Sequence, residues 1–162
     1  MKIGAMDLKG VPIFNKDFAG GKFGPDQRSF STVIADPGLQ EKLMKDGVRL
    51  YFPPRNPDSV EPPVGYLTVK LDNRYHDVDL IGVFPNDTVV RYDDSNYKDL
   101  DDLWIRNADI YVVLNQWEKK GRVGVTAYIK TGVFFFMSEE EKSERQAAAD
   151  DNPVKRRYSS YF

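Results

Sequence analysis

The chain has 162 residues, of which 41% are apolar and 30% are charged, and this composition is typical of one soluble globular domain with a little chain to spare. It has no cysteine, which excludes disulfide-dependent folds and thiolate chemistry and makes a reducing interior the natural compartment. The longest apolar runs, IYVVL and VFFFM, are too short to cross a bilayer, and the first residues lack the apolar stretch of a signal peptide. We therefore expect a cytoplasmic protein with no membrane contact.

Charge is unevenly spread along the chain, although the net charge is only −2. Residues 110–137 carry four Lys and Arg against one Glu, whereas residues 72–109 carry four against ten Asp. Phosphate binding depends on a local basic surface rather than on the total. A polyanionic partner is therefore not excluded.

The segment FAGGKFGPDQRSF, residues 18–30, combines aromatic rings, glycines and positive charge without helical or strand periodicity. Glycines let the backbone approach a ligand closely, which predicts a mobile hairpin tip that presents Lys22 and Phe23 to that ligand. The alternative is a plain β-turn whose Phe18 and Phe30 anchor the core, with Phe23 incidental.

Short apolar runs separated by Gly, Pro and Asn recur through the rest of the domain and indicate a mainly β fold. DPGLQEKLMKDG is the clear helix, with Asp36 as its cap, Pro37 in its first turn and Gly47 to end it. The five prolines of residues 53–65 predict an exposed loop, and the acidic residues 93–103 predict a turn or short helix.

Alternate residues of a strand face opposite sides of a sheet, and this parity carries the most informative signal. In VRLYF, the apolar residues Val48, Leu50 and Phe52 share the inward face, and in YLTVKL every second residue is again apolar. The outward residues of these two strands are Arg49, Tyr51, Tyr66, Thr68 and Lys70.

ADIYVVLNQWEKKGRVGVTAYIKT predicts a β-hairpin with EKKG as its turn. If Trp117 lies opposite Arg122, the apolar residues Leu114 and Val125 pair, as do Val112 with Ala127 and Ile110 with Ile129. A two-residue turn would slide this pairing and preserve the faces. The opposite face presents Tyr111, Asn115, Trp117, Arg122, Thr126, Tyr128 and Lys130.

Each of these segments thus has a core face and a second face on which aromatic rings alternate with cations. A flat ring can stack on any nucleobase while Lys and Arg neutralise the phosphates, and neither contact needs a particular sequence. The alternative is the ordinary composition of solvent-exposed strands. The candidate nucleic-acid-binding residues are Lys22, Phe23, Arg28, Arg49, Tyr51, Tyr66, Lys70, Tyr111, Trp117, Arg122, Tyr128 and Lys130.

Enzymatic functions have little support in the sequence. The single histidine, His76, has no partner histidine or cysteine for a metal. The aspartates of residues 93–102 lack the glycine and terminal Glu of a calcium loop, so we expect them to form a solvated acidic surface. No phosphate-cradling glycine loop, nucleophile elbow or zinc spacing occurs. We expect no catalysis, metal or cofactor. Two hypotheses remain, a single-stranded DNA-binding protein and a β-barrel adaptor that binds a protein partner through the aromatic face and tail.

The order of motifs over residues 14–136 resembles the single-stranded DNA-binding proteins of tailed bacteriophages. The features that carry the resemblance are Phe18, Gly20, Arg28 and Phe30 in the first segment, and Trp117, Gly121 or Arg122, Gly124, Val125, Ala127 and Tyr128 in the hairpin. The resemblance implies an OB-fold-like antiparallel barrel with one short helix. It also implies a replication or recombination protein that coats single strands, in the host cytoplasm if phage-encoded.

Residues 138–162 have almost no core-forming side chains, which predicts a domain of residues 1–137 followed by a flexible charged tail. Many relatives in the resembled family use an acidic tail with a terminal aromatic residue to recruit partner proteins. This tail has acidic stretches and ends in Phe162, but the basic residues 155–157 depart from that pattern. Recruitment of replication or recombination proteins, added DNA affinity, and a merely solvated end remain alternatives.

Overall fold

The computed structural model describes residues 1–22, 27–74 and 77–151, with side chains to residue 148. Phe23 and His76 lie outside the described residues, as does the end of the predicted tail. The elements in chain order are β1 (Lys2–Val11), β2 (Phe14–Asp17), β3 (Arg28–Ile34), α1 (Pro37–Lys45), β4 (Gly65–Leu71), β5 (Asp79–Val83), β6 (Val89–Tyr92), α2 (Asp99–Asp102), β7 (Ile105–Lys119), β8 (Arg122–Phe136) and α3 (Glu139–Asp151).

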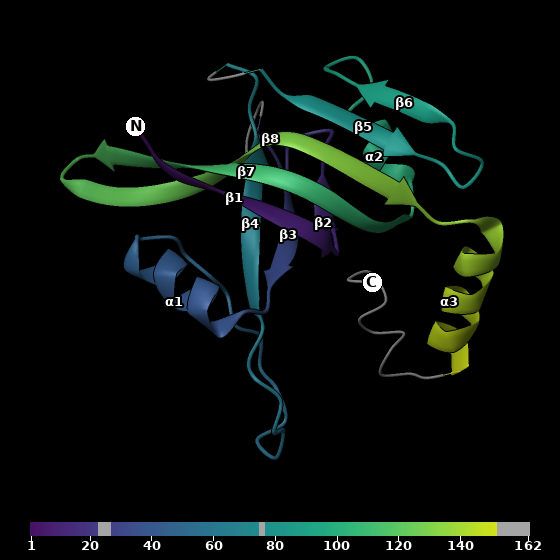
Figure 1. The fold of residues 1–162 in the computed structure, drawn as a ribbon, viewed down its shortest axis with the longest axis horizontal. Coiled ribbons are helices and arrows are strands. Elements are labelled where there is room, and N and C mark those ends of the chain that lie inside the picture. Colours follow the sequence, from purple (N-terminus) through teal and green to yellow (C-terminus); the bar gives the residue numbers. More distant parts are fainter. Residues whose placement is uncertain (23–26, 75–76, 152–162) are drawn as a thin grey trace.

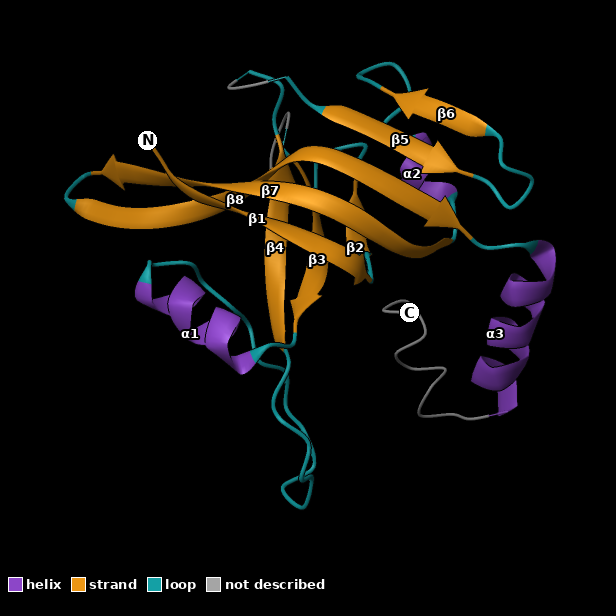
Figure 2. Ribbon diagram, viewed as in Figure 1, coloured by secondary structure: helices purple, strands orange, loops and turns teal. Residues whose placement is uncertain are grey.

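The strands form one sheet in the order β1-β7-β8-β4-β3-β2, and β5 pairs with both β8 and β6 (Figure 1). Strands β1, β7 and β8 run across β4, β3 and β2, so the sheet is strongly curved (Figure 2). Helix α1 lies beneath the β7–β8 hairpin, and α3 extends from the opposite end of β8.

The predicted mainly β architecture is confirmed, with three corrections. The sheet is not closed into a barrel, because β1 and β2 are its two ends and do not pair with each other. It is not wholly antiparallel either, since β4 and β5 each pair with β8 in parallel. The described residues also contain three helices rather than one. Strand periodicity reveals which side a residue faces but not which distant strand it pairs with.

Aromatic rings form the centre of the core. Phe18 and Phe30 are fully buried and stacked, with centroids 5.4 Å apart, and both contact the edge or face of Phe134. Edge-to-face and offset packing of such rings adds to the free energy of burial. The two phenylalanines that bracket the glycine-rich segment are therefore core anchors.

The predicted helix is confirmed as α1, residues 37–45. The Asp36 carboxylate accepts a hydrogen bond from the Leu39 N–H at 3.3 Å, which satisfies one of the free donors of the first turn. After the helix the chain passes through Gly47, whose φ of 99° favours glycine.

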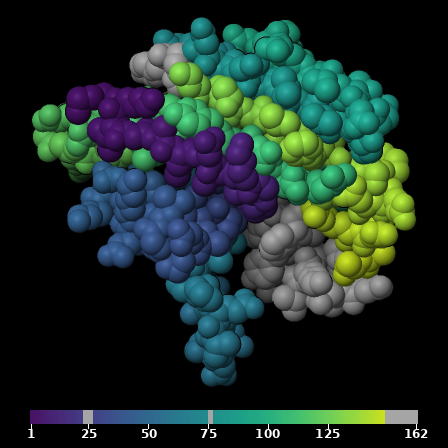
Figure 3. Space-filling model, viewed as in Figure 1, coloured from purple at the N-terminus to yellow at the C-terminus, as the bar shows by residue number. Residues whose placement is uncertain are grey.

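The predicted strand over residues 48–52 is wrong. Only two isolated bridges form, between Val48 and Val125 and between Tyr51 and Tyr66, and Phe52 is exposed rather than buried. Residues 53 and 54 are both proline and have no N–H to continue a ladder. The Pro-rich loop that follows projects from the body of the molecule, as predicted (Figure 3).

The β7–β8 hairpin turns through two residues, Lys120 and Gly121, which both have positive φ. This is the backbone of a tight hairpin turn that matches strand twist. Lys119 therefore pairs with Arg122, and Trp117 pairs with Gly124 instead of Arg122. The predicted pairing is wrong by two residues, and the predicted faces are kept because the slide is even.

A β-bulge interrupts the hairpin at Lys130. Val112 pairs with Ile129 while the preceding Tyr111 pairs with Thr131, so Lys130 is an extra residue with no partner in this ladder. Ile110 consequently pairs with Gly132, not with Ile129 as predicted. Strict alternation no longer determines the face of Lys130.

Helix α3 begins at the residues predicted to start the tail. The Ser138 hydroxyl accepts a hydrogen bond from the Glu141 N–H at 3.2 Å, and the Glu141 carboxylate receives two hydrogen bonds from the Arg106 guanidinium. This pairing lowers the pKa of Glu141 below its usual range. Within the described residues, no helix is long and apolar enough to span a membrane.

Replacing Leu114 with Ala should lower the free energy of unfolding by about 2 to 5 kcal/mol, because the side chain is buried in the core and truncation leaves a cavity. Val123→Ala on the same hairpin is the control, since Val123 is 60% exposed and its loss should change stability by less than about 0.5 kcal/mol. Urea denaturation followed by circular dichroism measures both. Equal effects would mean that Leu114 is not a core side chain.

Removal of residues 138–162 should lower the free energy of unfolding by no more than about 1 kcal/mol, because the ion pair between Glu141 of this segment and Arg106 of β7 joins partly exposed side chains. Thermal melting of the truncated and full-length proteins tests the predicted boundary at residue 137. A loss of many degrees would place α3 inside the folded domain.

Candidate nucleic-acid interface

Strand pairing gathers the predicted residues onto the sheet face that is turned away from the core. Lys70 of β4 lies beside Tyr128 of β8 on one side and Ser29 of β3 on the other. Tyr66, on the same face of β4, is bridged to Tyr51. We call this surface the aromatic–basic face; its members are Lys22, Ser29, Ser31, Arg49, Tyr51, Tyr66, Thr68, Lys70, Trp117, Arg122, Thr126 and Tyr128. Arg28 pairs with the core residue Leu71 and joins this site through the groove that it lines.

A polar groove of about 470 Å³ lies at the β3–β4 part of this face. Three of the predicted cations line it, together with hydroxyl and amide groups that can donate hydrogen bonds to an oxyanion. The lining residues are Asn15, Lys22, Gln27, Arg28, Ser29, Ser31, Thr68 and Lys70. Lys22 and Arg28 come from the single segment 18–30, whereas Lys70 comes from β4, much further along the chain.

The loop that carries Lys22 is held by two carboxylates. Asp17 accepts hydrogen bonds from the N–H groups of Gly20 and Lys22 at 3.0 and 3.1 Å. Asp101 of α2 accepts from the N–H groups of Phe18 and Ala19 at 2.8 and 2.9 Å. The described start of this loop, to residue 22, is therefore fixed to the sheet. Sequence reasoning treated the acidic segment as a solvated surface and missed the role of Asp101.

Lys16 joins the same region from β2 without belonging to the groove. Its ammonium donates to the carbonyl oxygens of Leu100 and Leu103 at 2.9 and 2.6 Å. Burial lowers the pKa of Lys16, and the nearby Asp101 and Asp102 only partly oppose this effect. This lysine attaches α2 to β2, and two of its three donors are already used.

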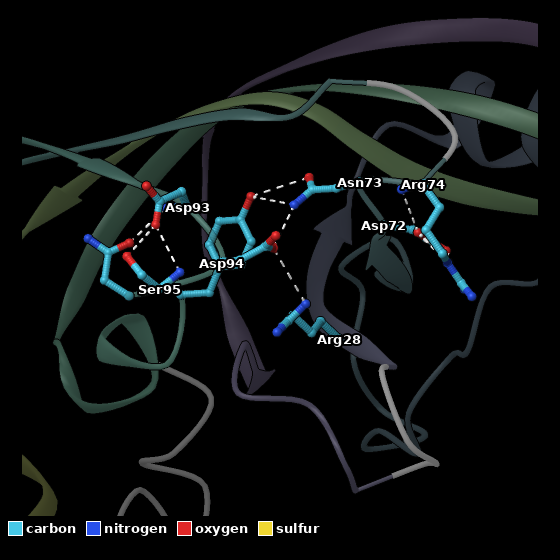
Figure 4. Close-up of polar contacts among 9 residues, drawn as sticks. Arg28, Asp72, Asn73, Arg74, Asp93, Asp94 and Ser95 are labelled. Carbon is cyan, nitrogen blue, oxygen red and sulfur yellow. Dashed lines mark hydrogen bonds and ion pairs between the residues drawn. The ribbon is translucent and has the colours of Figure 1, made fainter.

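Arg28 is the groove cation with the most constrained surroundings (Figure 4). Its Nη1 lies 3.8 Å from an Asp94 carboxylate oxygen, and its guanidinium lies over the Tyr97 ring at 5.5 Å from the centroid. The same Asp94 oxygen accepts a hydrogen bond from the Asn73 amide at 2.8 Å. The Arg28 Nε is buried and has no hydrogen-bond partner among the described residues.

Three aromatic rings form a row across β2, β4 and the bridged residue Tyr51. Tyr66 packs edge-on against Phe14, with centroids 4.8 Å apart, and lies 6.1 Å from Tyr51. Phe14 is buried and Tyr66 half-buried, whereas Tyr51 is 60% exposed. Tyr51 is therefore the ring of this row that can receive a base, and the other two support it. Phe14 is a supporting residue that no sequence signal distinguished from the core.

Trp117 lies across the hairpin and is 44% exposed. A Cβ atom added to Gly124 would overlap its ring, and its indole Nε1 donates to the Thr126 hydroxyl at 3.0 Å. Tyr128, two residues further along β8 than Thr126, is on the same face and half-buried. The hairpin thus presents a broad ring surface flanked by Arg122 at the turn.

The remaining predicted residues differ in how well they fit the face. Arg49 is exposed on the segment bridged to β8. Tyr111 lies beyond the bulge and is half-buried. It pairs with Asp7 of β1, so its neighbour on that strand is an acidic residue and not a cation. The position of Lys130 on this face stays a prediction, because the bulge removes it from the alternating pattern.

Among the residues that the structure describes, no group of three or more His, Cys, Asp or Glu could hold a metal ion. The acidic residues near the groove instead serve the protein itself. Asp93 accepts from the N–H and hydroxyl of Ser95, which lowers the pKa of Asp93. The site therefore offers rings, cations and hydroxyl groups, which together suit a flexible polyanion with exposed planar bases.

A curved sheet that carries rings and cations on one face defines the class of OB-like single-stranded nucleic-acid-binding proteins. The family model that matches residues 1–155 is described as "Putative phage ssDNA-binding domain". The chain belongs to this family, as the resemblance predicted.

Solved structures of similar fold come from two bacteriophages. A C-terminally truncated single-stranded DNA-binding protein from bacteriophage Enc34 is 12% identical with a TM-score of 0.51, and the match covers 84% of this chain and 87% of that one. The Enc34 protein in complex with ssDNA matches at 12% identity and a TM-score of 0.49, and the match covers 84% of this chain and 88% of that one. The single-stranded DNA-binding protein gp2.5, encoded by bacteriophage T7, is 11% identical with a TM-score of 0.40, and the match covers 85% of this chain and 88% of that one. The predicted OB-like fold is confirmed at this level. A comparison with curated proteins found no match.

Proposed function

We propose that this protein binds single-stranded DNA without sequence specificity during phage DNA replication or recombination, and that it is not an enzyme. The observation that carries the proposal is one continuous face on which a cationic groove adjoins exposed rings. Family membership supports the same conclusion. The protein would act in the cytoplasm of the infected host.

In this proposal the two parts of the aromatic–basic face have different tasks. Lys22, Arg28 and Lys70 neutralise phosphates in the groove, where serine and threonine hydroxyls add hydrogen bonds. Tyr51 and Trp117 receive bases on their exposed ring surfaces, and Arg49 and Arg122 hold the adjoining backbone. Stacking and phosphate contacts do not distinguish one base from another, which accounts for the lack of sequence specificity.

The tail has a separate proposed role in recruiting replication or recombination proteins. Its acidic stretch begins at residue 139, directly after β8, and three glutamates occupy the first turn of α3. Two of them, Glu139 and Glu140, are exposed. A charged and accessible helix of this kind suits contacts with partner proteins better than a contribution to the core.

Binding should be strong for oligo(dT) and far weaker for duplex DNA of equal length, because the rings must reach unstacked bases. If about four to six phosphates are neutralised, the slope of log K against log salt should be about −3 to −4. Fluorescence titration at several salt concentrations measures both quantities. Equal affinity for the two DNA forms would contradict stacking, and salt-independent or absent binding would favour the protein-binding adaptor.

Trp117→Ala should weaken oligo(dT) binding by about 1 to 3 kcal/mol, because it removes one stacking surface. Stability should change little, since the ring is partly exposed. Trp104→Phe is the matched control: Trp104 is similarly exposed but lines a separate cleft with Phe84 and Met137. DNA-induced quenching of tryptophan emission should persist in the control and be lost without Trp117. Unfolding of the Trp117 variant with full affinity per folded molecule would refute the assigned face.

A further inference from the structure

The partly exposed ring of Trp117 is held in place by two residues of β8, Gly124 and Thr126. Its partner across the hairpin is Gly124, and the atoms of the indole closest to that glycine belong to the six-membered ring. A Cβ atom on residue 124 would lie 2.7 Å from Cε2 and 3.0 Å from Cη2, and closer still to Cζ2. Carbon atoms do not approach so closely without displacement, so any side chain at position 124 would push the ring away.

The orientation of the indole within its own plane is fixed by a second contact. Its Nε1–H donates to the Thr126 hydroxyl, two residues further along β8 on the same face, at 3.0 Å. The ring therefore extends along β8 from residue 124 towards residue 126. Its outer surface remains accessible, in keeping with the 44% exposure of the residue.

We propose that Gly124 and Thr126 are positioning residues that hold the Trp117 ring as a preformed base-stacking surface; this inference rests on the proposed function. A ring that is already in place needs little ordering when DNA binds, and pre-organisation of this kind raises affinity. The indole N–H is the only polar hydrogen of the side chain, and Thr126 occupies it. A stacked base therefore meets only the π surface, which supports sequence-independent binding.

The first test needs no DNA. Trp104→Phe leaves Trp117 as the single tryptophan of the chain. In this background, Gly124→Ala and Thr126→Val should each raise the acrylamide quenching constant of Trp117 and lower its fluorescence anisotropy, because the ring is released. Thr126→Ser keeps the hydroxyl and should retain the parent values.

Matched controls separate positioning from general damage to strands. Gly4→Ala adds a methyl group to β1, where the nearest heavy atom apart from the neighbouring residues would be Leu114 Cδ1, at an ordinary contact distance of 3.8 Å. Thr131→Val makes the same change as Thr126→Val on an exposed residue of β8 that pairs with Tyr111. Neither control should alter the quenching or the anisotropy of Trp117. Thermal melting identifies any variant that fails to fold. If Gly124→Ala does not fold, Thr126→Val, which hardly changes the side-chain volume, still tests the inference.

The second test uses oligo(dT). Gly124→Ala and Thr126→Val should each weaken binding about fivefold or more, the lower end of the loss expected for one stacked base. In a Trp117→Ala background neither change should weaken binding further, because the ring that they position is gone. If Trp117→Ala weakens binding while Gly124→Ala and Thr126→Val alter neither affinity nor quenching, the positioning inference is overturned and the stacking function stands. If Trp117→Ala leaves affinity unchanged, the stacking role of Trp117 fails, and the inference fails with it.

Discussion

The short parallel pairing between β4 and β8 is the interaction on which the candidate interface depends. It consists of Val69 beside Ala127 and Lys70 beside Tyr128. Val69 and Ala127 are buried in the core, so their burial stabilises a ladder that is only two pairs long. On the opposite face of the sheet the same ladder places Lys70 of the groove next to the Tyr128 ring of the hairpin. Without it, the β7–β8 hairpin and the β3–β4 groove would be two separate surfaces.

The side of the sheet that each residue occupies was predictable because one side is buried. Leu67, Val69 and Leu71 alternate with polar and aromatic residues, and a strand that loses this alternation would lose its core contacts. The hairpin faces followed in the same way and survived a two-residue error in pairing. The bulge at Lys130 was not predictable, because neither composition nor alternation marks the point where one extra residue enters a ladder.

Contacts between distant segments were the part that the sequence did not reveal. Asp101 was predicted as part of an acidic surface, yet it accepts two backbone hydrogen bonds from the loop that begins at Phe18. Phe14 was indistinguishable from a core residue, yet it supports Tyr66 on the aromatic–basic face. Both roles depend on which strands become neighbours, and local propensity does not carry that information. The acidic composition of residues 72–109 thus has a structural use beyond solvation.

The placement of Asp94 beside Arg28 affects how the groove responds to ions. A cation that faces only water collects mobile counterions, and their release on binding contributes entropy and makes affinity depend on salt. Arg28 already has a fixed anion 3.8 Å away, itself held by Asn73. A phosphate that binds Arg28 would replace the Asp94 carboxylate as its partner, and this exchange would release no mobile ion into solution. Arg28 can thus orient a strand through directed hydrogen bonds while adding less to the salt dependence than Lys22 or Lys70.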